Sequence, residues 1–107
     1  MPKRGEIWLV DLGMAQKTRP AVILNVPHGD TDRVIVTVVT HTTSLRGSPF
    51  EISVPVPFLR EGAFAVQTVT TIPAKHALSR LGSLTPEQLG PIEDGVRAWL
   101  GLGSTTS

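Results

Sequence analysis

The sequence predicts a small β-rich α+β domain, in which about five strands form a closed or half-closed barrel and one helix follows. Most of the first two thirds of the chain consists of short apolar, β-branched runs separated by turns rich in glycine and proline. The stretch from 85 to 101 instead repeats its apolar residues at helical spacing. A chain of 107 residues, 40% of them apolar, is long enough for one such domain with a real core.

Five segments have the composition of strands. The strongest is 34–41, a nearly continuous β-branched run that is expected to be buried on both faces. The second segment is entered through Pro20, and the last is long enough to bend. The five predicted strands are Glu6–Leu12, Ala21–Asn25, Val34–His41, Phe50–Val54 and Ala63–Ile72.

The predicted helix has a clear start and a clear end. Thr85-Pro-Glu-Gln88 has the form of a capping box with proline at the first helical position, and Gly101 is expected to end the helix. Pro91 and Gly95 are poor interior residues, so a kink or a break near Pro91 is expected. A single domain over 1–107 would then close with a disordered tail at 103–107. One helix face carries Leu89, Ile92, Val96, Trp99 and Leu100.

Composition excludes some classes of function and leaves others open. Ten basic and nine acidic residues give a net charge near +1, so an RNA site would need a local arrangement of charge. The absence of cysteine excludes disulfides, thiolate metal sites and a cysteine nucleophile. The N-terminal segment lacks the apolar run of a signal peptide, and no apolar stretch is as long as a membrane span. We therefore expect a cytoplasmic protein with no membrane contact.

Four segments follow one another along the chain as a set of motifs. The first is Arg4-Gly-Glu-Ile-Trp-Leu-Val-Asp11, and the second is Lys17-Thr-Arg-Pro-Ala-Val-Ile-Leu24, which contains an Arg-Pro pair. The third runs from Val38-Val-Thr-His-Thr-Thr-Ser-Leu-Arg46 into Pro49-Phe-Glu-Ile52, and the fourth is the closing stretch 67–102. In this order the segments resemble the MazF/PemK (Kid-like) toxin family, the mRNA interferases of type II toxin–antitoxin systems, and the resemblance covers residues 4–102.

The resemblance implies an SH3-like β-barrel with a C-terminal helix, of the MazF/PemK/CcdB-like kind, that works as a homodimer. It further implies cleavage of single-stranded RNA without a cofactor or a metal, and a cognate MazE-like antitoxin that blocks the RNA groove. In this chemistry the ribose 2′-OH attacks its own 3′-phosphate and leaves a 2′,3′-cyclic phosphate and a 5′-OH. The enzyme must move a proton from the 2′-OH and stabilise the charge that develops on the phosphorane.

Two residues match the family's catalytic positions. Arg19, directly before Pro20, is expected to lie in the loop ahead of a buried strand and to clamp the phosphate with its planar guanidinium. It stays protonated and therefore does not act as the base. Thr42 is expected to position the 2′-OH or a phosphate oxygen, because a hydroxyl is a weak base. The structural alternatives are a surface arginine at a strand end and ordinary turn chemistry in Thr42–Ser44.

A second set of residues is predicted to bind RNA away from the reacting atoms. Lys17 and Arg46 flank the two catalytic segments, and Lys3 and Arg4 are further basic candidates. The resemblance adds Thr43, Gln67 and Thr68, although the family often has other residues at Thr68 and Thr70. This difference and the short loop at 13–18 leave the cleavage sequence unassigned. The aromatic residues Trp8, Trp99, Phe50, Phe58 and Phe64 are expected in the core and not as stacking surfaces.

His41 is the alternative general base, because an imidazole titrates near neutral pH. Strand alternation places Thr40 and Thr42 on one face and His41 on the other, unless a bulge intervenes. His41 is therefore expected to be partly buried beneath the barrel. No histidine or carboxylate cluster has metal-ligand spacing, so no metal site is predicted.

Two other functions are compatible with the sequence. A CcdB-like toxin would use the same barrel to bind DNA gyrase without nuclease activity, and Trp99-Leu-Gly101 faintly resembles the gyrase-contacting end of such proteins. A gyrase binder, however, has no use for a phosphate clamp built from Arg19 and Thr42. The third possibility is a nuclease-dead domain that only binds its antitoxin.

Overall fold

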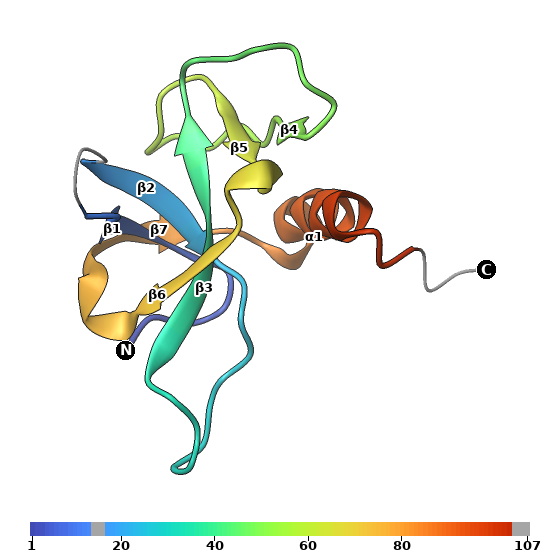
Figure 1. Ribbon diagram of the computed structural model, residues 1–107. Coiled ribbons are helices and arrows are strands. Elements are labelled where there is room, and N and C mark those ends of the chain that lie inside the picture. Colours follow the sequence, from blue (N-terminus) through green and yellow to red (C-terminus); the bar gives the residue numbers. More distant parts are fainter. Residues whose placement is uncertain (14–16, 104–107) are drawn as a thin grey trace.

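A computed structural model describes residues 1–13 and 17–103 (Figure 1). These residues form seven strands, two short 3-10 turns and one α-helix. In chain order the elements are β1 (Glu6–Asp11), β2 (Thr18–Ile23), β3 (Ile35–Thr42), β4 (Glu51–Ile52), β5 (Ala63–Ala65), η1 (Val66–Thr68), β6 (Thr70–Pro73), η2 (Ala74–His76), β7 (Ala77–Ser83) and α1 (Pro86–Leu100).

The sheet is antiparallel throughout and bends around β3. Its strand order is β4-β5-β3-β2-β1-β7, and β6 also pairs with β3. On one edge of β3, residues 35–38 pair with β6 while His41 and Thr42 pair with β5. On the other edge, residues 38–40 pair with β2. Because β4 and β7 end the strand order, the sheet is not closed, and the predicted half-closed barrel is confirmed.

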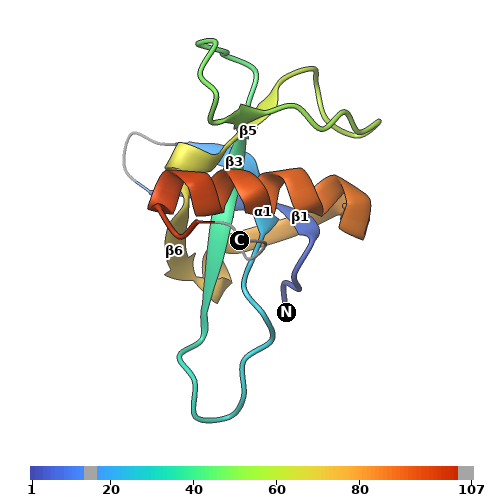
Figure 2. The same cartoon turned by 90° about the vertical axis from the view of Figure 1, so that its right-hand side faces the viewer.

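Alternation along the strands creates an apolar cluster on each face of the sheet. The first cluster packs against α1 and contains Ile7, Val22, Val39, Phe64, Leu89 and Ile92. The second lies on the opposite face and contains Val10, Ala21, Ile23, Val36, Val38 and Ile72. Neighbouring residues of one strand therefore belong to different clusters, as a period of two requires. Figure 2 shows α1 lying across the sheet on the first face.

The structure contains seven strands, whereas the sequence predicts five. The segment 63–72 is bent, as expected, and divides into β5, η1 and β6. The strand β7 is missing from the prediction because most of its side chains are exposed and its sequence, Ala-Leu-Ser-Arg-Leu-Gly-Ser, has neither an apolar run nor a regular alternation. It pairs with β1 as the outermost strand of the sheet, and such a strand needs little apolar content.

The capping box of α1 is confirmed. The Thr85 hydroxyl accepts a hydrogen bond from the Gln88 backbone N–H at 3.2 Å, and the Gln88 side chain accepts one from the Thr85 N–H at 2.8 Å. Gly101 ends the helix with a left-handed φ of 70°. The predicted break near Pro91 is wrong, since α1 is continuous over Pro86–Leu100. Contacts of Leu89 and Ile92 with the core, on either side of Pro91, outweigh the one hydrogen bond that proline removes.

The aromatic predictions are only partly correct. Phe64 is fully buried, but Phe58 and Trp99 are each 41% exposed. Trp99 lies at the end of α1, where its ring meets that of Phe50 edge-on at 5.2 Å. Of the tail predicted at 103–107, residues 104–107 lie outside the described residues, and so do residues 14–16 of the short loop. No helix in the described part of the chain is both long and apolar enough to cross a membrane.

Candidate active site

The two predicted catalytic residues lie where the β2–β3 ladder ends. The ladder runs from the pair Ile23–Val38 to the pair Ala21–Thr40 and stops there. Continuing the same register by two residues sets Arg19 opposite Thr42. Directly opposed residues of antiparallel strands share a face, and both residues line one pocket of about 660 Å³. Chain topology therefore brings together Arg19 and Thr42, which are far apart in sequence.

Pro20 explains why the strand can open at this point. Thr18, Arg19 and Pro20 pair only with β1, and Pro20 stands opposite Leu9. Proline has no N–H to donate to a ladder, so it is tolerated where one edge of a strand is unpaired. The prediction that Arg19 lies in a loop ahead of the strand is wrong. It is the second residue of β2, so its backbone is held in the sheet while its side chain is exposed.

Thr42 is held at the last position of β3 by a short turn. Its hydroxyl oxygen accepts a hydrogen bond from the Ser44 N–H at 3.0 Å. A threonine hydroxyl has one hydrogen to donate and two acceptor positions. The turn therefore occupies one acceptor position and leaves the hydrogen for a group in the pocket. Turn chemistry and a functional role are thus compatible at Thr42.

The pocket also contains three of the five residues predicted to bind RNA. Arg46, Gln67 and Thr68 line it, whereas Lys17 and Thr43 do not. Arg4, a further basic candidate, is occupied elsewhere by an ion pair with Glu93. Sequence reasoning did not propose the remaining polar residues of the lining, which are Thr40, Ser44, Ser48, Glu51 and Thr70.

The Thr68 hydroxyl already makes three hydrogen bonds within the protein. It accepts from the N–H and the hydroxyl of Thr40, at 3.0 and 2.9 Å, and donates to the Ala65 carbonyl at 2.6 Å. These bonds tie η1 to β3 between the segments that pair with β5 and β6. Thr68 therefore shapes the pocket floor, and a direct contact of its hydroxyl with RNA stays a prediction.

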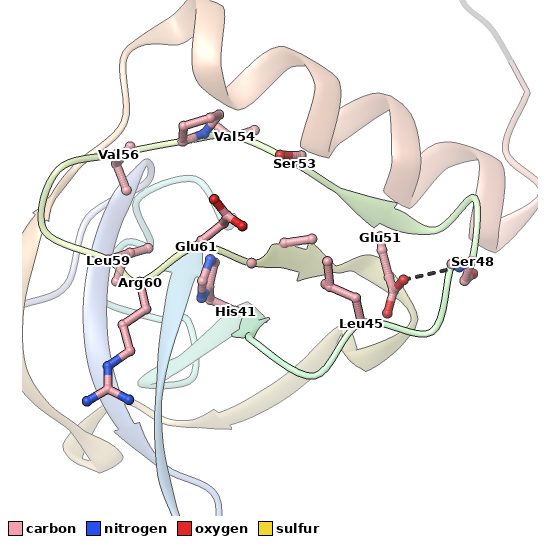
Figure 3. Close-up of a pocket in the computed structure, with 14 residues that line it drawn as sticks. His41, Leu45, Ser48, Glu51, Ser53, Val54, Val56, Leu59, Arg60 and Glu61 are labelled. Atoms are coloured by element: carbon pink, nitrogen blue, oxygen red, sulfur yellow. Dashed lines mark hydrogen bonds between the residues drawn. The ribbon is translucent and has the colours of Figure 1, made fainter.

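His41 faces away from this pocket, as strand alternation predicts. It lines a different cavity, also of about 660 Å³, between the 43–50 and 53–62 segments (Figure 3). Only 6% of its surface is exposed, and its ring packs edge-on against Phe64 at 5.0 Å. Burial lowers the pKa of His41 below its ordinary value. His41 lies on the face of β3 opposite the pocket of Arg19, which favours Thr42 over His41 as the residue at the phosphate.

Gly62 packs closely against the end of β3, at His41 and Thr42. A Cβ atom on Gly62 would overlap the Thr42 carbonyl and would lie 2.9 Å from Cε1 of His41. Only glycine fits against this part of β3 without displacing it. Sequence reasoning had no signal for this contact, because it depends on the path of the 53–62 segment.

The described residues offer no clustered metal ligands. Within 1–13 and 17–103, no group of three or more histidine, aspartate or glutamate side chains is arranged to hold a metal ion. The cations of the pocket lining are the guanidinium groups of Arg19 and Arg46. Of the ion pairs among the described residues, none involves either arginine.

The buried position of His41 predicts a pH dependence of stability. Because its pKa in the folded chain lies below the ordinary value of about 6.5, the unfolded chain takes up a proton that the folded chain does not. The stabilisation is complete above about pH 6.5 and declines as the pH falls towards the folded pKa. In urea titrations at about pH 7.5 and 5.5, His41→Gln should lose less unfolding free energy on acidification than the wild type. Equal losses in both proteins would contradict this assignment.

Comparison with known proteins agrees with the geometry. The family model of the PemK-like, MazF-like toxins of type II toxin–antitoxin systems matches residues 3–100. The fold is similar to Mycobacterium tuberculosis toxin MazF-mt6, with 25% identity over 92% of this chain and 99% of that chain and a TM-score of 0.78. An endoribonuclease from a mycobacterial species, solved with its cognate antitoxin, has 23% identity over 97% and 99% of the two chains and a TM-score of 0.81. A chain of the Deinococcus radiodurans MazE–MazF complex has 16% identity over 95% and 98% and a TM-score of 0.77. The chain belongs to the PemK-like, MazF-like toxin family of type II toxin–antitoxin systems.

Proposed function

We propose that this toxin is a sequence-specific, metal-independent endoribonuclease that cleaves single-stranded RNA, with mRNA as its cellular substrate. The observation that carries the proposal is that Arg19 and Thr42, at positions that continue the register of the β2–β3 ladder beyond its last pair, line one pocket. The structural neighbour from a mycobacterial species, an endoribonuclease, supports the same activity.

The proposed reaction uses the substrate's own hydroxyl as the nucleophile. The 2′-oxygen forms a bond to the adjacent phosphorus, the bond from phosphorus to the 5′-oxygen breaks, and the products are a 2′,3′-cyclic phosphate and a 5′-OH. The proton of the 2′-OH is released and the 5′-oxygen gains one. Arg19 donates to the phosphate oxygens as their charge increases. Thr42, whose hydroxyl is oriented by Ser44, directs a hydrogen bond to the same group.

This reaction needs no metal ion to generate a nucleophile. The charge that a metal would neutralise on the phosphorane can be met by the guanidinium group of Arg19, and the guanidinium of Arg46 in the same pocket adds positive charge for the neighbouring RNA backbone. A guanidinium remains charged at every physiological pH and offers a planar fork of donors that matches a phosphate. The pocket therefore contains the electrostatic component that the reaction requires.

The proposed partners are a MazE-like antitoxin and a second copy of the chain. The MazE–MazF complex of Deinococcus radiodurans and the mycobacterial endoribonuclease with its cognate antitoxin support an antitoxin partner. The CcdB-like alternative is not favoured, because the family match is to MazF-like toxins and the arginine–threonine pocket has no role in gyrase binding. Cleavage of single-stranded RNA by the purified protein would exclude the nuclease-dead alternative.

We predict a homodimer. Association would cover the exposed apolar side chains at the end of α1, where Trp99, Leu100 and Leu102 are 41%, 51% and 70% exposed. Unpaired strand edges also favour association. Sedimentation velocity at micromolar concentration should give a species of twice the chain mass of 11.5 kDa. A stable species of the single-chain mass would contradict the dimer.

Cleavage should not depend on divalent ions. Purified protein should cut a long single-stranded RNA in excess EDTA at the rate seen without chelator. The fragments should end in a 2′,3′-cyclic phosphate or the 3′-phosphate formed by its hydrolysis, which mass spectrometry can identify. Activity that is lost in EDTA and restored by magnesium would overturn the proposed reaction, and no cleavage at all would favour the nuclease-dead alternative.

Substitutions at Arg19 and Thr42 should affect the chemical step. Arg19→Ala should lower kcat by about 100- to 1000-fold, as expected for the loss of one preorganised donor to a developing charge. Arg19→Lys should restore little, because an ammonium lacks the bidentate fork. Thr42→Ala should be severe and Thr42→Ser mild, because serine keeps the hydroxyl.

His41→Ala is the matched comparison for Arg19→Ala, since it alters the opposite face of β3. It should retain much of its cleavage rate while losing stability. Single-turnover cleavage of an RNA oligonucleotide, with folding checked by circular dichroism, distinguishes these outcomes. If folded Arg19→Ala cleaves normally and folded His41→Ala is inactive, the reaction takes place on the His41 face of β3 and the proposed site is wrong.

A further inference from the structure

The turn that carries Arg46 is closed by a carboxylate. Both oxygens of Glu51 accept from the Arg46 backbone N–H, at 3.1 and 3.0 Å, and one of them also accepts from the Ser48 N–H at 3.1 Å. The Glu51 N–H in turn donates to the Ser48 carbonyl at 3.1 Å. Figure 3 shows the Glu51 side chain turned towards Ser48 across this loop. The segment 46–51 is therefore a closed unit centred on one carboxylate.

Gly47 makes the convergence of the two N–H groups possible. It has a left-handed φ of 74°, and a Cβ there would meet no atom within 4 Å. Successive backbone N–H groups around a left-handed residue form a concave site for an anion. Here the anion is supplied by the protein itself, four residues further along the chain.

Glu51 also lies between the two cavities. It lines the pocket of Arg19 and Thr42 and the cavity of His41. A negative charge in a pocket for a polyanion is unfavourable unless it has another role. Its oxygens are directed at backbone N–H groups, and no ion pair among the described residues joins it to Arg19 or Arg46. The charge therefore acts on the loop backbone and leaves both guanidinium groups available to a phosphate.

We infer that Glu51 is a positioning residue, which holds the backbone of Arg46 so that its guanidinium contacts an RNA phosphate beside the scissile one. This inference rests on the proposed function for its RNA contact. The closed turn itself is independent of that function. Without the carboxylate, the backbone N–H groups of Arg46 and Ser48 would lose their acceptor and the turn would become mobile. No apolar contact of the core would be removed.

Whether Glu51→Ala strengthens or weakens RNA binding distinguishes a positioning role of Glu51 from an effect of its charge alone. If Glu51 acted only through its charge, Glu51→Ala would remove a repulsion and RNA would bind more tightly. If it positions Arg46, the same change weakens binding. Glu61 is the matched control, because it is an exposed carboxylate that lines the His41 cavity but not the pocket of Arg19, and no hydrogen bond of its side chain occurs among the described residues.

The test measures the affinity for an RNA oligonucleotide with a 2′-deoxy substitution at the cleavage site, over a range of salt. Glu51→Ala and Arg46→Ala should each weaken binding by about fivefold or more. Each should also reduce the slope of log affinity against log salt by about 0.7, the value for one lost contact to a single strand. The double variant should resemble Arg46→Ala alone. Glu51→Gln, which keeps one acceptor oxygen, should fall between Glu51→Ala and the wild type, and Glu61→Ala should not weaken binding.

Gly47→Ala provides a second variant that changes no charge. It strains the left-handed position and should weaken binding in the same direction as Glu51→Ala. Tighter or unchanged binding by folded Glu51→Ala, or independent losses that multiply in the double variant, would overturn the inference. A shift of cleavage towards other bases in Glu51→Ala, with unchanged salt slope, would likewise overturn it in favour of base recognition.

Amide hydrogen exchange keeps this test separate from the proposed function. In the free protein, the Arg46 and Ser48 amides should be protected in the wild type and in Glu61→Ala, and should exchange faster in Glu51→Ala. Protection that is unchanged by Glu51→Ala would overturn the positioning role even if the wild type cleaves RNA. A wild type that neither binds nor cleaves RNA would overturn the proposed function and the RNA contact, while the exchange data still decide whether the closed turn exists.

Discussion

The end of the β2–β3 ladder is the constraint on which the candidate site depends. Beyond the pair Ala21–Thr40 the two strands no longer exchange hydrogen bonds. Pro20 removes a donor at this position, while β1 continues to hold the β2 backbone. Arg19 and Thr42 lie beyond the last pair, at positions that continue its register, and both line one pocket. Rigid backbones on both sides hold a guanidinium and a hydroxyl towards one pocket, which is the preorganisation that stabilisation of a phosphorane requires.

The period-two geometry of β3 then assigns different tasks to adjacent residues. Thr40 and Thr42 face the pocket, whereas Val39 and His41 face the other side of the sheet. On that side, Phe64 packs against the ring of His41 and Gly62 packs against the Thr42 backbone, and these contacts hold the end of the strand in place. The strand β3 thus contributes to the apolar cluster on each face of the sheet, and two of its last residues, Thr40 and Thr42, line the candidate pocket.

Local patterns predicted much of the fold and the faces of β3. The capping box at Thr85, the bend within 63–72 and the opposite orientations of His41 and Thr42 all follow from short-range sequence spacing. The strand β7 could not be predicted, because an exposed outer strand lacks the apolar signal. The continuity of α1 through Pro91 also depends on tertiary contacts, which a local rule for proline does not include.

The residues of the candidate site that could be predicted came mostly from the family resemblance, and Arg46 was predictable from its place next to the Thr42 segment. Arg19 and Thr42 came from motifs, and their opposition came from the register of two strands. The role of Glu51 could not be read from its motif, since it depends on backbone N–H groups whose direction is set by a left-handed glycine. Such contacts lie between a side chain and the backbone, and residue types alone do not reveal them.

The most direct measurement is a crystal structure of the protein with an RNA oligonucleotide whose scissile nucleotide lacks its 2′-OH. Our expectation is that the scissile phosphate lies between the Arg19 guanidinium and the Thr42 hydroxyl, each within hydrogen-bond distance of a phosphate oxygen. A scissile phosphate bound in the His41 cavity, or away from both Arg19 and Thr42, would contradict it.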